Sequence, residues 1–335
     1  MNILHKISDK LKRNYRIYSE ALDKGKIMGF GYTLLLWKNH TKFLLRMRNS
    51  EFRFAEVDKV VDFMEKQFGT FVDQYKEQLI YNYDILIDDS WRQNKIWVFW
   101  NNPDSMPLMV QSCIDRIRQM SNGHEVVILT EGNLKDYIDF EPVVWRKYKE
   151  GIITRTHLSD FIRVAVLYRY GGVYFDSTIY PTRPLDDKFF NLPFFSNHTE
   201  RTPNDPQIAH SRWSSFMCGC RRGNLLMKAA LETFTEYWKR YNGLMDYVLI
   251  DYTYNILYNH VPSIKQMIDN TPFNNPHIWA QQACLDKPCT EKRFQELMAD
   301  PLADVYKFSY KDSIGLPLHD ENGTPTLLGR ICGEK

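Results

Sequence analysis

The spacing of the apolar positions changes in the middle of the chain. Over residues 158–170, apolar side chains recur every three to four positions, which predicts a helix with one buried stripe. Gly171 follows this run, and glycine readily adopts the left-handed conformation that ends a helix. Residues 172–178 then alternate, so Val173 and Phe175 are expected to face the core from a strand. The pattern predicts a helix, a glycine stop and a strand in direct succession.

Polar side chains share the other face of this predicted strand. They are Tyr174, Asp176 and Thr178. On the preceding helix, Asp160 and Arg163 are three residues apart and therefore lie on one face. We expect the side chains of Asp160, Arg163 and Asp176 to converge on one pocket next to Trp100. Taken singly they have ordinary alternatives, because a helix surface often carries an ion pair and an Asp often caps a turn.

A strand, a helix and a second strand are predicted before this region. Residues 95–100 are aromatic and β-branched and end at the turn-forming run 101–103. Pro107 opens a helical pattern, and a second strand pattern covers 125–130. This order predicts an α/β, Rossmann-like fold with parallel strands and ligands bound beyond their carboxyl ends. Trp100 lies at such an end, although taken singly it has the ordinary alternative of a core aromatic.

The first ninety residues have helical character. Their clearest apolar face is formed by Val57, Val60, Val61, Met64 and Phe68. We expect residues 1–92 to form a basic helical extension and residues 93–335 to form the catalytic domain, with the connection around 90–94.

Two further helices are predicted after the central motif, over residues 223–241 and 247–258. Asp246 and Asp251 lie close to or on the second helix. They are candidate contacts for an acceptor molecule, with a capping or surface role as the alternative.

The composition describes an ordinary globular chain. It has 335 residues, of which 44% are hydrophobic and 25% are charged. The six Cys residues have neither zinc-ligand spacing nor a regular disulfide framework, so we expect reduced thiols in a cytoplasmic protein. No stretch approaches the roughly 20 apolar residues of a membrane span. No nucleic-acid recognition pattern accompanies the basic residues, so nucleic acid is not an expected partner.

Positive charge is concentrated in residues 1–53. This segment carries 12 Lys and Arg against 4 Asp and Glu, a net charge of +8 that leaves −6 for the rest of the chain. Such a segment can make peripheral contact with an anionic bilayer, where each charge contributes roughly 1 kcal/mol. The alternative is an amphipathic helix packed on the catalytic domain. The basic residues include Lys6, Lys10, Lys12, Arg13, Arg16, Lys42, Arg46, Arg48 and Arg53, and the apolar ones Ile7, Leu11, Phe30, Leu34, Leu35, Leu36 and Trp37.

The run over residues 158–178 resembles the centre of nucleotide-sugar glycosyltransferases of the GT-A type. In these enzymes a Ser-Asp-x-x-Arg helix leads through Gly-Gly-x-Tyr to an Asp-x-Asp motif. The resemblance is closest to the capsular polysaccharide synthesis family. It is more distantly similar to DxD-containing glycan mannosyltransferases and to glucosylating toxins, and it extends from about residue 95 to at least residue 238.

The resemblance also implies roles for single residues. Asp160 and Arg163 correspond to the residues that hold the ribose and the sugar, and Tyr174 to the tyrosine beside them. Asp176 and Thr178 stand where the two aspartates of the motif serve the sugar and the metal. In the same families an aromatic residue at the end of the first strand stacks on the base, which is the position of Trp100.

Thr178 departs from the motif, because it replaces a carboxylate by a neutral hydroxyl. The resemblance implies a divalent cation, Mn²⁺ or Mg²⁺, and such ions prefer anionic oxygen ligands. Asp176 is then the only metal ligand that the motif supplies, and the diphosphate oxygens would complete the coordination. The Asp-x-Thr form is similar to what the capsular family has, so we interpret it as a feature of a subfamily.

The resemblance implies a glycosyltransferase of the hexosyltransferase class. It would transfer a sugar from a nucleoside-diphosphate sugar to a glycan or lipid-linked saccharide in capsular or surface polysaccharide synthesis, with retention at the anomeric carbon. Asp176 and Arg163 are the expected catalytic residues, and the inner face of the membrane is the expected location. Two alternatives stay open. One is a catalytically inactive scaffold of a polysaccharide assembly complex, and the other is a sugar-phosphate transferase.

Overall fold

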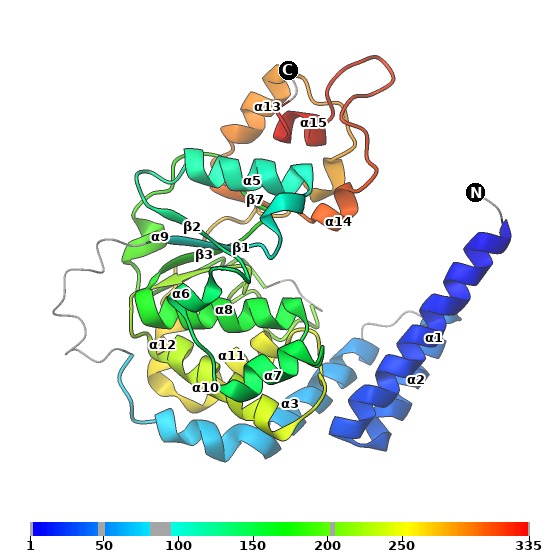
Figure 1. Ribbon diagram of the computed structural model, residues 1–335, viewed down its shortest axis with the longest axis vertical. Helices are drawn as coiled ribbons and strands as arrows, with labels where there is room; N and C mark the ends of the chain where they lie inside the picture. Colours follow the sequence, from blue (N-terminus) through cyan, green and yellow to red (C-terminus); the bar gives the residue numbers. More distant parts are fainter. Residues whose placement is uncertain (1–2, 46–50, 81–94, 202–204, 334–335) are drawn as a thin grey trace.

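The structure is a computed structural model, and it describes residues 3–45, 51–80, 95–201 and 205–333. It has an α/β fold with helices at the N-terminal end (Figure 1), so the predicted fold class is confirmed. The predicted connection around 90–94, with its boundary between residues 92 and 93, lies outside the described residues. So do Arg46, Arg48 and the side chains of Lys6, Ile7 and Lys10.

A five-stranded sheet forms the centre of the molecule. Its strands are β1 (Ile96–Phe99), β2 (Val126–Leu129), β3 (Gly172–Asp176), β5 (Phe194–Ser196) and β6 (Met217–Cys220), in the order β2-β1-β3-β6-β5. β1 is parallel to β2, as predicted, and also to β3, whereas β6 is antiparallel to β3 and β5. Phe99 is level with Leu129 and with Asp176, so the three parallel strands end at one edge of the sheet.

Helices cover both faces of this sheet (Figure 1). The helix predicted after Pro107 is α5 (Leu108–Gln119), and it packs on the face that carries Val98 and Phe175. The other face carries Trp97 and Tyr174, and α8 (Arg155–Tyr170) covers it. Two further helices pack outside α8, namely α10 (Leu225–Arg240) and α11 (Leu249–His260). Parallel strands in this position are buried on both faces, which is why they are nearly continuous in apolar residues.

Local sequence determines where α8 begins and ends. Thr154 caps the amino end, because its side chain accepts a hydrogen bond from the backbone N–H of His157. At the other end Gly171 has φ of 71°, and a Cβ there would lie 2.6 Å from the backbone nitrogen of Arg222. The predicted glycine stop is therefore confirmed. The strand that follows ends at Asp176, two residues earlier than predicted, because Ser177 and Thr178 form a turn.

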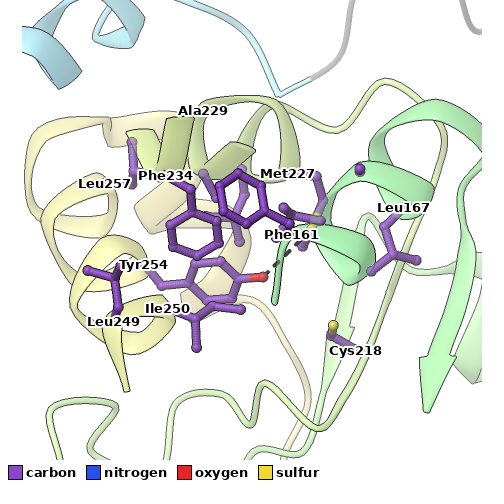
Figure 2. Close-up of a cluster of buried hydrophobic side chains, with 14 of the residues drawn as sticks. Phe161, Leu167, Cys218, Met227, Ala229, Phe234, Leu249, Ile250, Tyr254 and Leu257 are labelled. Atoms are coloured by element: carbon purple, nitrogen blue, oxygen red, sulfur yellow. Dashed lines mark hydrogen bonds between the residues drawn. The ribbon is translucent and has the colours of Figure 1, made fainter. Parts of the chain in front are cut away.

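The largest apolar cluster lies between α8, α10 and α11 (Figure 2). Phe161 of α8 contacts Phe234 of α10 with ring centroids 5.5 Å apart. The Tyr254 hydroxyl of α11 donates to the Met227 sulfur at 3.7 Å. α10 and α11 correspond to the two helices that were predicted after the central motif.

The third helix, α3 (Glu51–Val72), joins this cluster from the N-terminal part of the chain. Val57, Val60, Met64 and Phe68 are buried, as their spacing predicted, and Val61 is half-buried. The helix continues through Gly69 to Val72. The apolar face of α3 therefore belongs to the same core as α8, α10 and α11.

The first two helices form an antiparallel hairpin beside the main body (Figure 1). They are α1 (Ile3–Met28) and α2 (Phe30–Leu44), and Gly29 between them has φ of 92°. The hairpin is held by hydrogen bonds from Thr33 to the Ala21 carbonyl and from Trp37 to the Tyr18 carbonyl, each 3.1 Å. Within the described part of the chain, no helix combines the length and the apolar character that crossing a membrane requires.

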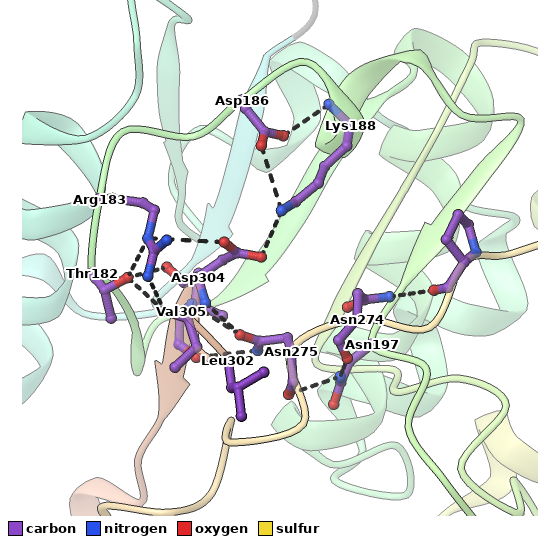
Figure 3. A network of polar contacts seen from close by, with 12 residues as sticks. Thr182, Arg183, Asp186, Lys188, Asn197, Asn274, Asn275, Leu302, Asp304 and Val305 are labelled. Carbon is purple, nitrogen blue, oxygen red and sulfur yellow. Dashed lines mark hydrogen bonds and ion pairs between the residues drawn. The ribbon is translucent and has the colours of Figure 1, made fainter. Parts of the chain in front are cut away.

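A second, two-stranded sheet pairs β4 (Ile179–Pro181) with β7 (Val305–Lys307). Polar contacts hold the start of β7 (Figure 3). The Asn275 side-chain oxygen accepts from the backbone nitrogens of Asp304 and Val305 at 2.7 and 3.2 Å, and Lys188 pairs with Asp304 at 2.7 Å. The helices α13 (Glu291–Met298), α14 (Tyr310–Ser313) and α15 (Leu327–Ile331) lie on this side, with α5.

The remaining short elements connect these layers. They are η1 (Asp73–Tyr75), η3 (Pro103–Ser105), α6 (Leu134–Tyr137), α7 (Pro142–Lys149), α9 (Lys188–Asn191), α12 (Pro262–Asp269) and η4 (Gln282–Cys284).

His260, the last residue of α11, contacts acidic residues of α3 and of the following η1. His260 Nδ1 lies 2.9 Å from Asp73 Oδ1, and His260 Nε2 lies 2.9 Å from Glu65 Oε1. Partial burial opposes the charge of His260, but the hydrogen bonds to Asp73 and Glu65 outweigh it and raise the pKa of His260 above its usual value. The imidazolium form therefore stabilises the contact between the two helices.

We expect the variant His260→Gln to be less stable than the unaltered protein by about 0.2–1 kcal/mol near pH 6. Because the folded pKa exceeds the unfolded value of about 6.5, this contribution is complete below that pH and is lost as the pH rises through the folded pKa. Urea unfolding at about pH 6 and about pH 9 measures it. The control is Lys59→Gln, which removes an exposed pair with Asp62 inside α3. An equal deficit at both pH values for His260→Gln contradicts the prediction.

Candidate functional site

A cleft of about 790 Å³ opens at the carboxyl edge of the parallel strands. Each parallel strand delivers a residue to it: Trp100 follows β1, Glu131 follows β2 and Asp176 ends β3. From the opposite side, Lys307 of β7 and Tyr310 of α14 line the same cleft. Its position agrees with the rule that open parallel sheets bind ligands beyond their carboxyl ends.

Three charged side chains contact one another in a line that runs from the interior to the cleft. Arg163 Nη1 lies 3.2 Å from Asp160 Oδ1, and Arg163 Nη2 donates to Asp176 Oδ1 at 3.2 Å. The Arg163 guanidinium also lies over the Tyr174 ring, 5.0 Å from its centroid. Asp160 and Arg163 are about 95% buried, whereas the Asp176 side chain is 29% exposed and lines the cleft. The structure thus brings the predicted residues together, with Asp160 and Arg163 behind Asp176 and not on the cleft surface.

Burial shifts the pKa values of Asp160, Arg163 and the neighbouring His157. It raises the pKa of Asp160 to about 7, against the opposing effect of the Arg163 charge. Burial by itself disfavours the charge on Arg163, but Asp160 and Asp176 outweigh it and raise the pKa of Arg163. His157 lies 3.6 Å from Asp160, and burial, together with the Arg163 charge, lowers the pKa of His157 to about 4. His157 is therefore neutral near pH 7, and Arg163 is the fixed positive charge of the group.

Lys307 contacts the motif from the cleft side. Its Nζ donates to Thr178 Oγ1 at 2.6 Å and to the Phe308 carbonyl at 3.2 Å, and it lies 3.4 Å from Asp176 Oδ2. Both carboxylate oxygens of Asp176 therefore face a cation. Lys307 was not predicted from the sequence, although it stands between two aromatic residues, Tyr306 and Phe308, where an unpaired charge is unusual.

The aromatic wall of the cleft lies next to these charges. Trp100 is half-buried, and its ring meets that of Tyr310 edge to face, with centroids 5.4 Å apart. The Trp100 indole N–H donates to the Asn102 carbonyl at 2.9 Å. The side-chain oxygen of Asn101, which also lines the cleft, is buried without a hydrogen-bond partner among the described residues. Trp100 thus packs partly against the core and partly lines the cleft.

The candidate acceptor contacts lie elsewhere. Asp246 accepts from the backbone N–H of Val248 at 3.1 Å and pairs with Lys24 at 3.6 Å. Asp251 accepts from the Trp213 indole at 3.0 Å, and burial raises the pKa of Asp251 to about 6. These are structural contacts. The residue between them that lines the cleft is Tyr247.

The donor set at the motif does not suit a divalent cation. Mg²⁺ and Mn²⁺ need several oxygen ligands, preferably anionic ones. In the described part of the chain, no group of three or more His, Cys, Asp or Glu residues is arranged to hold a metal ion. Asp176 is a single carboxylate with Arg163 on one oxygen and Lys307 on the other, and the Thr178 hydroxyl already accepts from Lys307.

We expect Arg163→Met to destabilise the fold by roughly 3–5 kcal/mol, because it leaves Asp160 buried without its cation. Loss of the Arg163 charge raises the pKa of Asp160 further, so the deficit grows as the pH rises through about 7. Urea unfolding across this range measures both effects. Arg155→Met is the control on the same helix, since its side chain is 71% exposed and its loss should matter by less than about 1 kcal/mol. A deficit for Arg163→Met as small as that of the control contradicts the prediction.

Comparison with known proteins places the chain in a family. The model of the capsular polysaccharide synthesis protein family matches residues 42–315. The glycosyltransferase afumC of Aspergillus fumigatus (strain CBS 144.89 / FGSC A1163 / CEA10) is 27% identical over 169 residues. That match spans 45% of this chain and 42% of the relative, less than half of its length. The solved structure of the PaToxG glycosyltransferase matches 78% of this chain and 92% of its own, with 14% identity and a TM-score of 0.35. On the family match, this protein belongs to the capsular polysaccharide synthesis protein family, as its central motif predicted.

Proposed function

We propose that this protein is a GT-A-like glycosyltransferase that moves a sugar from a nucleoside-diphosphate sugar to a hydroxyl of a glycan or lipid-linked saccharide. The observation that carries the proposal is the grouping of Trp100, Asp176 and Thr178 along one cleft at the carboxyl edge of the parallel strands. Its volume, about 790 Å³, is within the range of roughly 300–1,000 Å³ that is typical of small-molecule sites. Membership of the capsular polysaccharide synthesis family supports the substrate class.

The proposed roles follow from exposure and charge. Trp100 stacks on the base of the nucleotide sugar. The Asn101 side-chain oxygen is buried without a described partner, and it accepts a hydrogen bond from a hydroxyl or a base N–H of the nucleotide sugar. Asp176 accepts from sugar hydroxyls, because it is the exposed end of the line of charged side chains. Arg163 and Asp160 position Asp176, since both are buried behind it. Catalysis then comes mainly from orientation of the reactants and from stabilised phosphate charge.

The family resemblance is the basis for proposing retention. An inverting enzyme needs a carboxylate that can take the proton of the acceptor hydroxyl. Among the described residues that line the cleft, the carboxylates are Asp176 and Glu131. Asp176 faces two cations, and Glu131 accepts from the Tyr148 hydroxyl and lies 3.7 Å from Arg155. Both carboxylates are therefore already engaged by other side chains, which supports retention.

Turnover with a panel of nucleotide sugars tests the function. A thermal-shift screen identifies the donor, because a ligand that binds the native state raises its apparent stability. Mass analysis of the product then distinguishes the candidates. A mass gain of one sugar supports the proposal, and a gain of a sugar phosphate indicates the sugar-phosphate transferase. Binding without turnover, even with a glycan or lipid-linked acceptor present, indicates the inactive scaffold.

Trp100→Ala is expected to weaken donor binding by about 5- to 150-fold, which corresponds to the roughly 1–3 kcal/mol that a base gains by stacking on an aromatic side chain. Titration calorimetry with the donor from the screen measures it. The matched control is Trp145→Ala, on α7 and away from the cleft, where the indole N–H donates to Asp139. Equal affinities of Trp100→Ala and the unaltered protein contradict the stacking role.

We also propose that the α1–α2 hairpin contacts an anionic membrane surface, as the cytoplasmic leaflet provides. Five of its large apolar side chains are more than half exposed, beside basic residues of the same helices. This combination is typical of helices that lie in a membrane interface. The apolar residues are Leu11, Tyr15, Phe30, Phe43 and Leu45, and the basic ones include Lys12, Arg13, Arg16 and Lys42.

Sedimentation with anionic vesicles measures this contact. Reversing three charges, in the variant Lys12→Glu, Arg13→Glu and Arg16→Glu, should lower binding by about 100-fold or more, since each basic residue contributes roughly 1 kcal/mol. The control variant Lys292→Glu and Arg293→Glu changes exposed charges on α13, remote from the hairpin. Binding that is equally weak to anionic and neutral vesicles in the unaltered protein contradicts the proposal.

A further inference from the structure

We propose that the Lys307 ammonium is the cation of the donor diphosphate subsite and that this enzyme works without a divalent metal. The inference rests on the proposed function, since it assigns a role within the same cleft. It explains the residue that departs from the Asp-x-Asp motif. A second aspartate would be a metal ligand, whereas Thr178 presents a hydroxyl that accepts a hydrogen bond from Lys307 at 2.6 Å.

The ammonium has a hydrogen-bonding position left for a ligand. Lysine carries three N–H donors. Two of them are used, by Thr178 Oγ1 at 2.6 Å and by the Phe308 carbonyl at 3.2 Å. The contact with Asp176 Oδ2, at 3.4 Å, is an ion pair without hydrogen-bond geometry. Lys307 lines the cleft with a side chain that is only 11% exposed, so its charge acts on a bound phosphate with little screening by water.

The carboxylate of Asp176 is already compensated by two cations, so it is a weak ligand for a metal ion. Arg163 and Lys307 each bring one positive charge to its two carboxylate oxygens. A divalent ion bound to Asp176 and Thr178 would have to displace Lys307 from both contacts and then lie beside its ammonium. Two neighbouring cations repel each other strongly in a partly buried site. The same position therefore holds either Lys307 or a metal, and this chain supplies Lys307.

The backbone holds this ammonium in place before any ligand binds. Lys307 lies opposite Ile179 in the pairing of β7 with β4, and its backbone N–H donates to the Ile278 carbonyl at 2.8 Å. Asn275 fixes the start of β7, as Figure 3 shows, through Asp304 and Val305. A charge that is positioned in advance does not have to reorganise when the leaving group departs, which is the condition for effective electrostatic catalysis.

The reaction balances without a metal. The bond between the anomeric carbon and the phosphate oxygen breaks, and its electron pair stays on the phosphate. The acceptor hydroxyl oxygen forms the new bond to the anomeric carbon, and its proton passes to the departing phosphate. The products are the glycoside and the nucleoside diphosphate. The negative charge that develops on the leaving oxygen is stabilised by the Lys307 ammonium.

The first arm of the test uses the unaltered protein. Turnover of the donor found in the screen is measured with a chelator and with added Mn²⁺ or Mg²⁺. We expect the rates to agree within about twofold. Loss of activity in the chelator, with recovery on adding Mn²⁺, overturns the inference while leaving the proposed glycosyltransferase function intact.

The second arm measures binding of uridine, guanosine, cytidine and adenosine diphosphates, with their nucleosides for comparison, in the presence of a chelator. The unaltered protein should bind one diphosphate better than its nucleoside. Lys307→Met should lose this preference by about 10-fold or more, and Lys307→Arg should keep most of it. Lys287→Met, on an exposed surface, is the control. Metal-free, Lys307-dependent binding without sugar transfer would refute the function and retain only the assignment of Lys307 as the cation of the diphosphate subsite. Failure of every diphosphate to bind without metal overturns the inference.

A third arm exchanges the two kinds of cation. The double variant Thr178→Asp and Lys307→Met restores a pair of carboxylates and removes the ammonium. It should recover turnover only when Mn²⁺ is present, in contrast to Lys307→Met alone, whose kcat we expect to fall by about 100-fold or more. Thermal unfolding of each variant verifies that it folds.

Discussion

The buried charge of Arg163 is the constraint from which the site follows. A guanidinium stays charged in proteins, so burying it between α8 and β3 requires anionic partners. Asp160 provides one from the preceding turn of the same helix, and Asp176 provides the other from the end of the strand. The two carboxylates therefore cannot move independently. Asp176 is held at the edge of the sheet by an interaction whose other members never reach the cleft.

Backbone geometry makes this interaction possible. The helix and the strand are joined by Gly171 and Gly172, both with positive φ, which lets the chain reverse within two residues. The Trp97 indole donates to the Gly171 carbonyl at 2.9 Å, so the reversal is also held by the neighbouring strand. Because β3 lies between β1 and β6, it is fixed on both sides. At the end of this strand, the Asp176 backbone pairs with Phe99 on one side and donates its N–H to the Phe216 carbonyl at 2.9 Å on the other.

Sequence reasoning succeeded where the determinants are local. The stop at Gly171, the buried stripe of α8 and the parallel pairing of β1 with β2 follow from spacing and turn chemistry over a few residues. It did not foresee that Asp160 and Arg163 would lie behind Asp176. Their i, i+3 spacing is the same on an exposed and on a buried helix face, and α10 and α11, which cover α8, come later in the chain. Lys307 is 129 residues from Thr178, so no local pattern links them.

The pairing of β4 with β7 in the second sheet explains why Lys307 contacts Thr178. Thr178 directly precedes β4, and β4 pairs with β7 in a register that sets Ile179 opposite Lys307. β4, which follows the motif, thus pairs with β7, which carries Lys307. In antiparallel strands a residue lies beside the neighbours of its partner, so Lys307 meets the residue just before Ile179, which is Thr178. An acidic residue at position 178 would place a second carboxylate beside Lys307, which already lies 3.4 Å from Asp176 Oδ2, whereas a hydroxyl orients the ammonium without adding negative charge. The replacement of aspartate by threonine and the lysine of β7 are therefore best understood as two parts of one arrangement.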